Sequence, residues 1–282
     1  MPAILIHGVP DTHHVWDGVR EHLTRSDVEA WDLPGFGSPR PEGFTCTKED
    51  YVSWLIERLE GIGEPVDLVG HDWGCLLTAR VASVRPDLIR TWAGSNGPVS
   101  AEYDWHPLAK LWQDPVAGDR WAKEYDAAAF ARDLTDNLQV PAEPAEQTAG
   151  RVDETMRDSI LKLYRSALTV GAEREPDLAN LAGPFLVFWG ALDPVCPVEF
   201  GETMAAAVRA TRFLRLDSSH WTPIQKPAEA AAAAPCNRCP PHRVSLWPGL
   251  QGDGAVVRVP PRLGRRRRSH RFLSRGPAAG AG

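Results

Sequence analysis

Short apolar segments alternate with helical patterns along most of this chain, and that alternation constrains the fold more than any other feature. Six segments predict strands: AILIHG, VEAWDLPG, PVDLVGHD, IRTWAGSN, PFLVFWGALD and TRFLRLDSSH. Between them, VWDGVREHL, KEDYVSWLIERLEGIG and CLLTARVASV carry apolar residues at helical spacing. Strands that alternate with helices in this way favour an α/β fold, with a mostly parallel sheet and helices on both faces.

One long interval breaks this alternation. Roughly eighty residues between Asn96 and Phe185 contain helical patterns but no apolar strand, which is too long for a simple crossover. We therefore expect a helical cap over residues 99–183. It would be inserted between a first core part, residues 1–98, and a second core part, residues 184–234.

The last segment, residues 235–282, differs from the rest in composition. It has ten arginines, no lysine and one acidic residue, whereas the remainder has 36 acidic and 21 basic residues. RLGRRRRSH is compatible with a nucleic-acid patch, but the acidic body disfavours nucleic acid or anionic lipid as a partner. We interpret this tail as disordered or as the product of a shifted reading frame, and assign it no function.

Cysteine usage and the apolar runs indicate the compartment. The five cysteines form no disulfide framework, which fits a reducing environment. The opening MPAILIHG is too short for a signal peptide, and no run is long enough to span a membrane. Cys236 and Cys239 have metal-site spacing, but no second pair follows. We expect a cytoplasmic protein with no metal and no organic cofactor, since no phosphate or dinucleotide fingerprint is present.

The segment VGHDWGC places Asp72 between Gly70 and Gly74, where an apolar strand turns into a helix. Small residues on both sides of a central side chain are typical of a nucleophile elbow, which presents that side chain above the sheet. A helix cap is the simpler interpretation of an aspartate there. The helix-cap interpretation is less favoured here because two further strand ends carry an acid and a histidine that could complete a catalytic triad with Asp72.

These partners follow other predicted strands. Asp193 and His220 come after the last two, so the chain order is nucleophile, acid, histidine, and we predict the triad Asp72, Asp193 and His220. The HGVP segment ends the first strand, and the backbone N–H groups of Val9 and Trp73 are the predicted oxyanion hole. Singly, the acid and the histidine could be ordinary turn and loop residues.

The segments HGVP, DLPGFG, GHDWG and SHWTP resemble the α/β-hydrolase superfamily, specifically its epoxide hydrolase and haloalkane dehalogenase branch. The resemblance extends over residues 2–234 and implies the α/β-hydrolase fold, with a helical cap inserted after the sixth strand. The family places two strands before the one in AILIHG. We therefore expect these N-terminal strands to be missing.

An aspartate nucleophile indicates the reaction class. A carboxylate that attacks an ester would give an unfavourable anhydride, whereas attack on a saturated carbon gives a stable alkyl ester. His220, oriented by Asp193, would then deprotonate the water that hydrolyses the ester of Asp72. The predicted substrate is therefore a small molecule, an epoxide or a halogenated alkane.

The leaving group distinguishes the two branches. In SILKLYRSAL, Tyr164 matches a cap motif of epoxide hydrolases, although packing alone could explain it. LAKLWQDP is similar to the stretch that supplies their second tyrosine, but Leu108 occupies that position. Tyr103 or Tyr125 could replace it, although neither matches the motif.

A halide needs N–H donors instead, and Trp73 and Trp112 are the candidates. HGVP lacks the asparagine that many haloalkane dehalogenases have after His-Gly. SHWTP is closer to the epoxide hydrolase form. We expect epoxide hydrolysis to a vicinal diol, with haloalkane dehalogenation as the alternative. An inactive or ligand-binding relative remains a further possibility.

Overall fold

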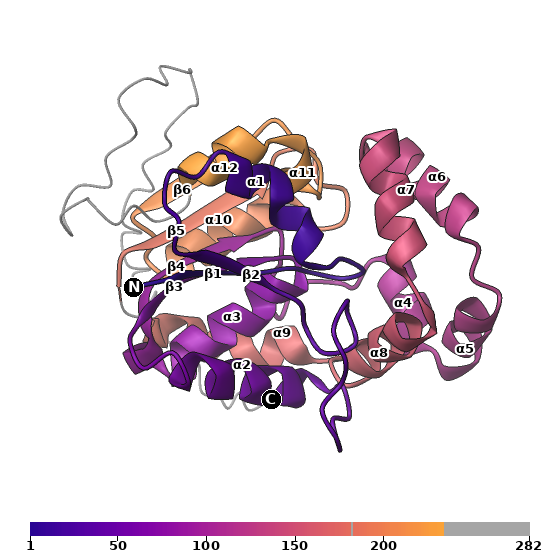
Figure 1. The fold of residues 1–282 in the computed structure, drawn as a ribbon, viewed down its shortest axis with the longest axis horizontal. Helices are drawn as coiled ribbons and strands as arrows, with labels where there is room; N and C mark the ends of the chain where they lie inside the picture. The colour runs from indigo at the N-terminus through magenta and orange to yellow at the C-terminus, as the bar shows by residue number, and fades with distance from the viewer. Residues whose placement is uncertain (182, 234–282) are drawn as a thin grey trace, which may run out of the picture.

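The computed structural model describes residues 1–181 and 183–233 (Figure 1). The predicted tail, residues 235–282, lies outside the described residues. Six parallel strands form one sheet in the order β2-β1-β3-β4-β5-β6. They are β1 (Ala3–Ile6), β2 (Val28–Trp31), β3 (Val66–His71), β4 (Ile89–Ser95), β5 (Phe185–Gly190) and β6 (Arg212–Leu216). Each lies within a segment predicted as a strand, so the parallel α/β fold is confirmed.

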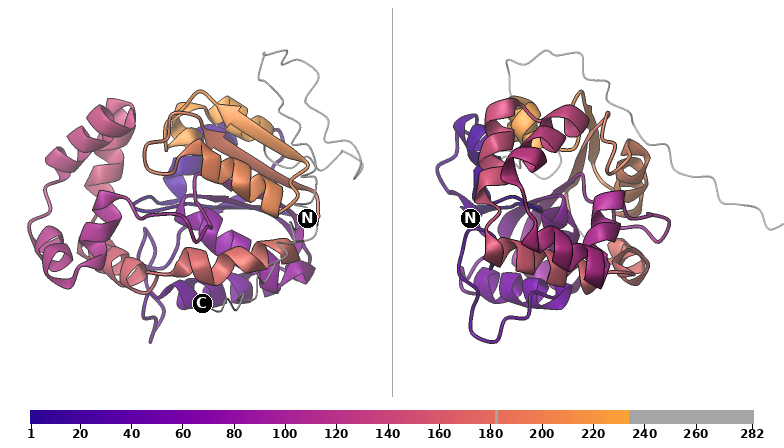
Figure 2. Two further views of the ribbon diagram at one scale, coloured as in Figure 1. Left: turned by 180° about the vertical axis from the view of Figure 1, so that it is seen from behind. Right: turned by 90° about the vertical axis from the view of Figure 1, so that its right-hand side faces the viewer.

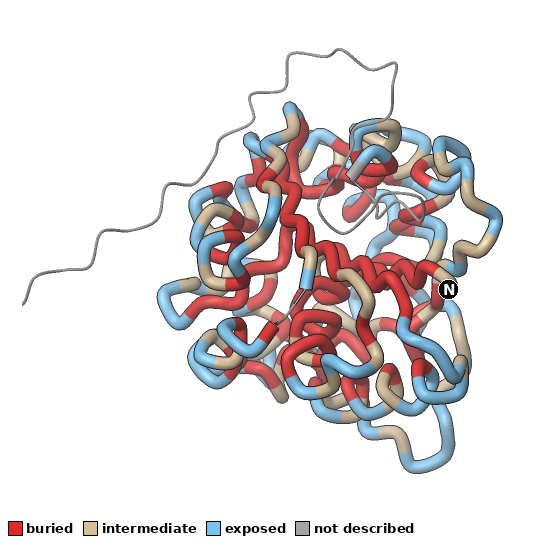
Figure 3. Tube along the Cα trace, turned by 90° about the vertical axis from the view of Figure 1, so that its left-hand side faces the viewer, coloured by how far each residue is buried: buried red, intermediate tan, exposed pale blue. Residues whose placement is uncertain are grey.

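Burial follows the position of each strand in the sheet. All residues of β1, β3 and β5 are buried, as expected for strands covered on both faces. The edge strands β2 and β6 are only partly buried. Figure 3 shows the buried residues gathered in the middle of the molecule, with exposed residues on the outer turns.

Helices cover both faces of the sheet. In Figure 1, α2 (Lys48–Glu60) and α3 (Trp73–Val84) lie below the sheet, and α1 (Asp17–Glu21) and α12 (Pro227–Ala233) lie above it. The remaining core helices are η1 (His13–Trp16), η2 (Pro86–Leu88), α10 (Val198–Ala207) and α11 (Thr222–Gln225). Among the described residues, no helix is both long and apolar enough to cross a bilayer.

Helix α2 illustrates how the sequence specifies these elements. Thr47 and Asp50 form a capping box, in which each side chain accepts a hydrogen bond from the other residue's backbone N–H. Tyr51, Leu55 and Leu59 are buried, and they are the residues that helical spacing places on one face. The helix ends before Gly61.

The described residues between β4 and β5 form helices and no strand. These are α4 (Pro107–Gln113), α5 (Pro115–Lys123), α6 (Ala127–Leu138), α7 (Ala142–Arg151), α8 (Glu154–Arg165), α9 (Val170–Arg174) and η3 (Glu175–Asn180). Figures 1 and 2 show α4 to α7 beyond the end of the sheet at which the parallel strands finish. We call residues 99–181 the inserted segment.

Candidate active site

Asp72 occupies the turn between β3 and α3 with an unusual backbone conformation. Its φ is 52° and its ψ is −123°, a region that non-glycine residues rarely adopt. Its N–H donates to the Ser95 carbonyl (2.9 Å), and its carbonyl accepts from the Cys75 N–H (2.8 Å). Strained backbone that is held in place by such contacts is typical of functional turns.

The two glycines of the turn permit this geometry. A methyl group on Gly70 would collide with the carbonyl of Gly74, and one on Gly74 would collide with the carbonyl of Ile6 in β1. Helix α3 can therefore approach the strands closely only because both positions lack a side chain.

Replacing Gly74 by alanine is therefore expected to lower the free energy of unfolding by about 3 kcal/mol or more, because the clash is with rigid backbone. Gly150, in α7, is the matched control, since a methyl group there would meet no atom within 4 Å. Gly150→Ala should be neutral or slightly stabilising. Denaturant unfolding of both variants measures the difference, and equal stability losses would contradict this account of the turn.

The structure brings the three predicted triad residues together. His220 Nε2 lies 3.4 Å from Asp72 Oδ2, and His220 Nδ1 lies 2.9 Å from Asp193 Oδ2. The other oxygen of Asp193 accepts from the backbone N–H groups of Val195 and Cys196, both at 2.8 Å. The imidazole is thus oriented by a fixed carboxylate, with its second nitrogen toward Asp72.

Asn96, at the end of β4, also supports this arrangement. Its Nδ2 donates to Asp193 Oδ2 (2.7 Å), and its Oδ1 accepts from Thr222 Oγ1 (3.0 Å). Its φ is 50°. The sequence analysis did not identify this residue. Its position in IRTWAGSN, just past a strand end where parallel strands present functional groups, is the signal that could have indicated it.

One of the two predicted oxyanion-hole donors, the Val9 N–H, contacts the Asp72 carboxylate. The Val9 N–H donates to Asp72 Oδ1 at 2.8 Å. Trp73 is the first residue of α3, where backbone N–H groups have no acceptor within the helix. A methyl group on Gly8 would collide with the Asp72 side chain, so this loop approaches the carboxylate closely because it has a glycine there.

The charges of Asp72 and His220 stabilise each other. Burial alone would raise the pKa of Asp72, but the hydrogen bond and charge of His220 hold it below its usual value. Burial opposes a charge on His220 as well. The charge of Asp193 and the hydrogen bonds to Asp193 and Asp72 nevertheless raise the pKa of His220 well above its usual value. The carboxylate of Asp72 is therefore ionised at neutral pH.

A small cavity of about 10 Å³ adjoins Asp72, roughly the space that one water molecule needs. Side chains from the inserted segment and the core line it together, including Trp73, Trp105, His106 and Tyr164. The Tyr164 ring lies edge-on to Trp73, with 5.2 Å between ring centroids. Burial raises the pKa of Tyr164 well above its usual value, so the hydroxyl keeps its proton and is a potential donor.

Two residues of α4 do not line this cavity. Trp112, a candidate halide donor from the sequence, is buried behind Tyr164, with the two ring centroids 4.8 Å apart. Its indole N–H has no hydrogen-bond partner in the described part of the chain. Leu108, at the position of the second tyrosine motif, is half-buried and also absent from the lining.

The two alternative tyrosines differ in position. Tyr103 lines the cavity, and its hydroxyl donates to the Val195 carbonyl at 3.0 Å. Tyr125 lies away from the cavity, and its hydroxyl donates to the Ala149 carbonyl at 2.8 Å. Of these two, only Tyr103 lines the cavity beside Asp72.

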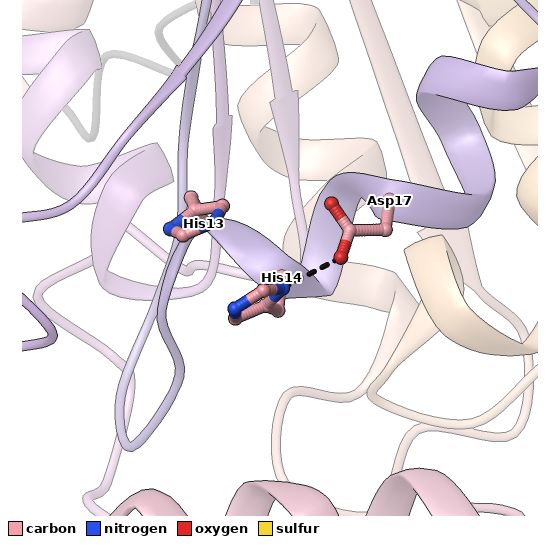
Figure 4. A group of neighbouring side chains, drawn as sticks. All are labelled: His13, His14 and Asp17. Atoms are coloured by element: carbon pink, nitrogen blue, oxygen red, sulfur yellow. Dashed lines mark hydrogen bonds and ion pairs between the residues drawn. The ribbon is translucent and has the colours of Figure 1, made fainter.

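Two groups of side chains in the described residues have the composition of metal ligands. One is Asp193, Cys196 and His220, which belongs to the triad region. The other is His13 and His14 in η1 with Asp17 at the start of α1 (Figure 4). The sequence analysis identified neither group as a metal site.

Comparison with known proteins agrees with this fold. Residues 3–234 match the Alpha/beta hydrolase family. (E)-2-((N-methylformamido)methylene)succinate hydrolase of Acinetobacter baylyi is 35% identical over 98 residues, which is 34% of this chain and only 37% of that protein. Lipase LipV of Mycobacterium tuberculosis is 27% identical, covering 82% of this chain and 90% of the lipase. A haloalkane dehalogenase of Bradyrhizobium diazoefficiens is 26% identical, covering 76% of this chain and 79% of the dehalogenase.

Solved structures are similar in fold. An esterase from Thermogutta terrifontis has a TM-score of 0.69 and 21% identity, covering 82% of this chain and 86% of the esterase. Haloalkane dehalogenase DbeA from Bradyrhizobium elkani has a TM-score of 0.68 and 19% identity, covering 82% of this chain and 88% of the dehalogenase. Together with the family match over most of its length, this establishes that the chain belongs to the alpha/beta hydrolase family.

Proposed function

We propose that this hydrolase opens epoxides to vicinal diols through a covalent alkyl ester on Asp72. The observation that carries the proposal is the ionised Asp72 carboxylate at the strained turn, with one oxygen held by the Val9 N–H and the other facing His220. A carboxylate at this position favours attack on a saturated carbon.

In the first step, Asp72 Oδ2 attacks a ring carbon of the epoxide and the carbon–oxygen bond breaks. The leaving oxygen takes a proton from the Tyr164 hydroxyl, which lines the same cavity. Tyr103 is the second hydroxyl at the cavity. Donors placed where negative charge develops lower the barrier more than donors in water do, because the site is largely closed to solvent.

In the second step, His220 deprotonates a water molecule, which attacks Cγ of the Asp72 ester. The Cγ–Oδ2 bond then breaks, and the diol leaves with Oδ2 and takes the proton from His220. The remaining proton of the added water passes from the Asp72 carboxyl to the deprotonated Tyr164, which restores both groups. The charge that develops on Oδ1 is stabilised by the N–H groups of Val9 and Trp73. Esterification removes the negative charge of Asp72 beside His220. The pKa of His220 therefore falls in the intermediate, which favours its action as a base.

We propose that the inserted segment acts as a lid. Trp105, His106 and Tyr164 all come from this segment and line the cavity next to Asp72. A cavity of about 10 Å³ is too small for an epoxide, so substrate entry requires the lining side chains or the inserted segment itself to move.

Haloalkane dehalogenation is the second candidate. The match to the Bradyrhizobium diazoefficiens haloalkane dehalogenase favours it, and Trp73 places an indole at the cavity. The same Asp72 attack would apply, with a halide as the leaving group. A halide is stabilised by N–H donors and needs no proton.

Product analysis distinguishes these chemistries. We expect diol from an aryl epoxide and no bromide from a 1-bromoalkane of similar size. In ¹⁸O-labelled water, a single turnover with excess enzyme should transfer unlabelled oxygen from Asp72 to the diol. Label in the diol during that first turnover would contradict the covalent mechanism, and bromide release without epoxide opening would favour the dehalogenase.

Tyr164→Phe provides a test of the leaving-group donor. Removing the hydroxyl is expected to slow epoxide opening about 100-fold, because the leaving oxygen loses its proton source. Tyr125→Phe is the matched control and should leave the rate unchanged, since its hydroxyl binds Ala149. Single-turnover rates of ester formation on Asp72 measure the effect, and equal rates in the two variants would exclude Tyr164 from this role.

A further inference from the structure

Adjacent histidines begin the first helical turn after β1. His13 and His14 lie in η1, and Asp17 is the first residue of α1 (Figure 4). The two imidazoles lie against each other, with 4.0 Å between ring centroids. Val15 and Trp16, between the histidines and Asp17, are buried and anchor the turn to the core. The three polar side chains are therefore presented together from a fixed backbone.

Each imidazole has a carboxylate partner. His13 Nδ1 lies 2.8 Å from Asp32 Oδ2, and the His13 backbone N–H donates to the other oxygen of Asp32 at 2.7 Å. His14 Nδ1 lies 2.6 Å from Asp17 Oδ2. For His13, a carboxylate that accepts from Nδ1 fixes the tautomer and leaves Nε2 with a lone pair. For His14, Nδ1 and Asp17 Oδ2 already face each other, so a cation can bind between them in place of the hydrogen bond. Histidines that ligate metals commonly have this carboxylate partner, which orients the ring and raises its basicity.

The three side chains also converge. One potential ligand atom from each of His13, His14 and Asp17 lies within 4.8 Å of the other two. All three are partly exposed, so a cation can reach them and retain water at its remaining positions. Arg20 Nη1 lies 3.7 Å from Asp17 Oδ1 and is the positive charge that competes for this carboxylate.

We propose that His13, His14 and Asp17 bind a divalent transition-metal ion such as Zn²⁺. Two imidazoles and one carboxylate suit Zn²⁺, Co²⁺, Ni²⁺ or Cu²⁺, whereas Mg²⁺ and Ca²⁺ prefer oxygen ligands alone. Asp32 is the outer carboxylate that orients His13. This proposal revises the expectation of a metal-free protein, and it does not depend on the reaction at Asp72.

The proposed metal-binding group, His13, His14 and Asp17, lies beside a second cavity. His14 and Asp17 line a cavity of about 250 Å³ between the core and α7, together with the buried Asp11 and with Arg151 of α7. A metal ion held at His14 and Asp17 would be accessible to a small ligand in this cavity. The site therefore lies where the core and the inserted segment meet.

The test is calorimetric titration of the full chain, free of any affinity tag, with ZnCl₂. We expect one saturable site in the wild type. His13→Gln and His14→Gln should each weaken binding at least about tenfold, and Asp32→Asn, outside the direct ligands, by about 10- to 100-fold. His22→Gln is the matched control, because His22 is exposed at the end of the same helix, and it should bind as the wild type does.

Co²⁺ substitution separates this site from the thiols of the chain. We expect a visible spectrum without a thiolate-to-cobalt charge-transfer band, because the proposed ligands contain no sulfur. Such a band would assign the metal to Cys196 or to Cys236 and Cys239 and would overturn the proposal. Absence of saturable binding, or unchanged affinity in both histidine variants shown to be folded by thermal melts, would overturn it as well.

Discussion

Asp72→Ala is expected to lower kcat for epoxide hydrolysis at least about 10⁴-fold, because the variant has no group that can form the covalent intermediate. The residual rate would come from binding and from the N–H donors of Val9 and Trp73 alone. Steady-state assays over a substrate series measure the loss.

Stability provides the control for this variant. Asp72 is strained at φ 52°, and its ionised side chain is balanced by His220. Alanine retains the strained backbone but removes one partner of the Asp72–His220 pair. We expect a cooperative thermal transition whose midpoint shifts at most modestly from that of the wild type. Full activity in a folded Asp72→Ala protein would show that the nucleophile lies elsewhere.

His220→Gln should separate the two steps of the reaction. Multiple-turnover activity is expected to fall by about 10³- to 10⁴-fold, because no base remains to activate water. Formation of the ester should change only a few-fold, since Asp72 still attacks. A burst of one equivalent followed by a stalled enzyme is the expected time course, and loss of the burst itself would contradict a role confined to the second step.

The pH dependence of the wild type follows from the same two groups. The pKa of Asp72 is held below its usual value, so ester formation should persist to about pH 4, near the usual pKa of an aspartate. Hydrolysis requires the neutral form of His220, whose pKa is raised in the free protein and falls when esterification removes the charge of Asp72. Ester hydrolysis should therefore accelerate as the pH rises, and a rate that falls with increasing pH would contradict the assignment of His220 as the base.

The sequence predicted the elements of the core well because these depend on local patterns. Each strand of the sheet lies within an apolar segment, and the buried face of α2 follows from helical spacing. The turn at Asp72 was also predictable, since only glycine tolerates the close approach at Gly70 and Gly74. Parallel strands bring their carboxyl ends to one edge of the sheet, which is why Asp72, Asp193 and His220 could be grouped without coordinates.

Contacts that depend on the rotation and packing of the inserted helices could not be predicted in the same way. Trp112 and Leu108 lie on α4, and small rotations of this helix decide which side chains reach the cavity. Tyr103 reaches it from a segment that matches no motif. The strand-end position of Asn96 is visible in the sequence, but its hydrogen bond to Asp193, 97 positions away in the chain, is not.

The His13, His14 and Asp17 group illustrates a further limit. The sequence alone does not determine how the side chains of two adjacent histidines are oriented relative to each other. Here the turn η1 brings the two ring centroids to 4.0 Å from each other, and Asp32, just past the end of β2, orients the His13 ring. Only tertiary structure supplies that second carboxylate.

The most direct test of the central claim is the intact mass of His220→Gln protein after incubation with an aryl epoxide. We predict a mass increase equal to the whole epoxide, located on Asp72 by peptide mapping, since the ester forms but is not hydrolysed. A parallel incubation with a bromoalkane should give no adduct. An alkyl adduct without bromine would retain Asp72 as the nucleophile but assign a halide leaving group. An unchanged mass with both reagents, in protein shown to be folded, would contradict the nucleophilic role of Asp72.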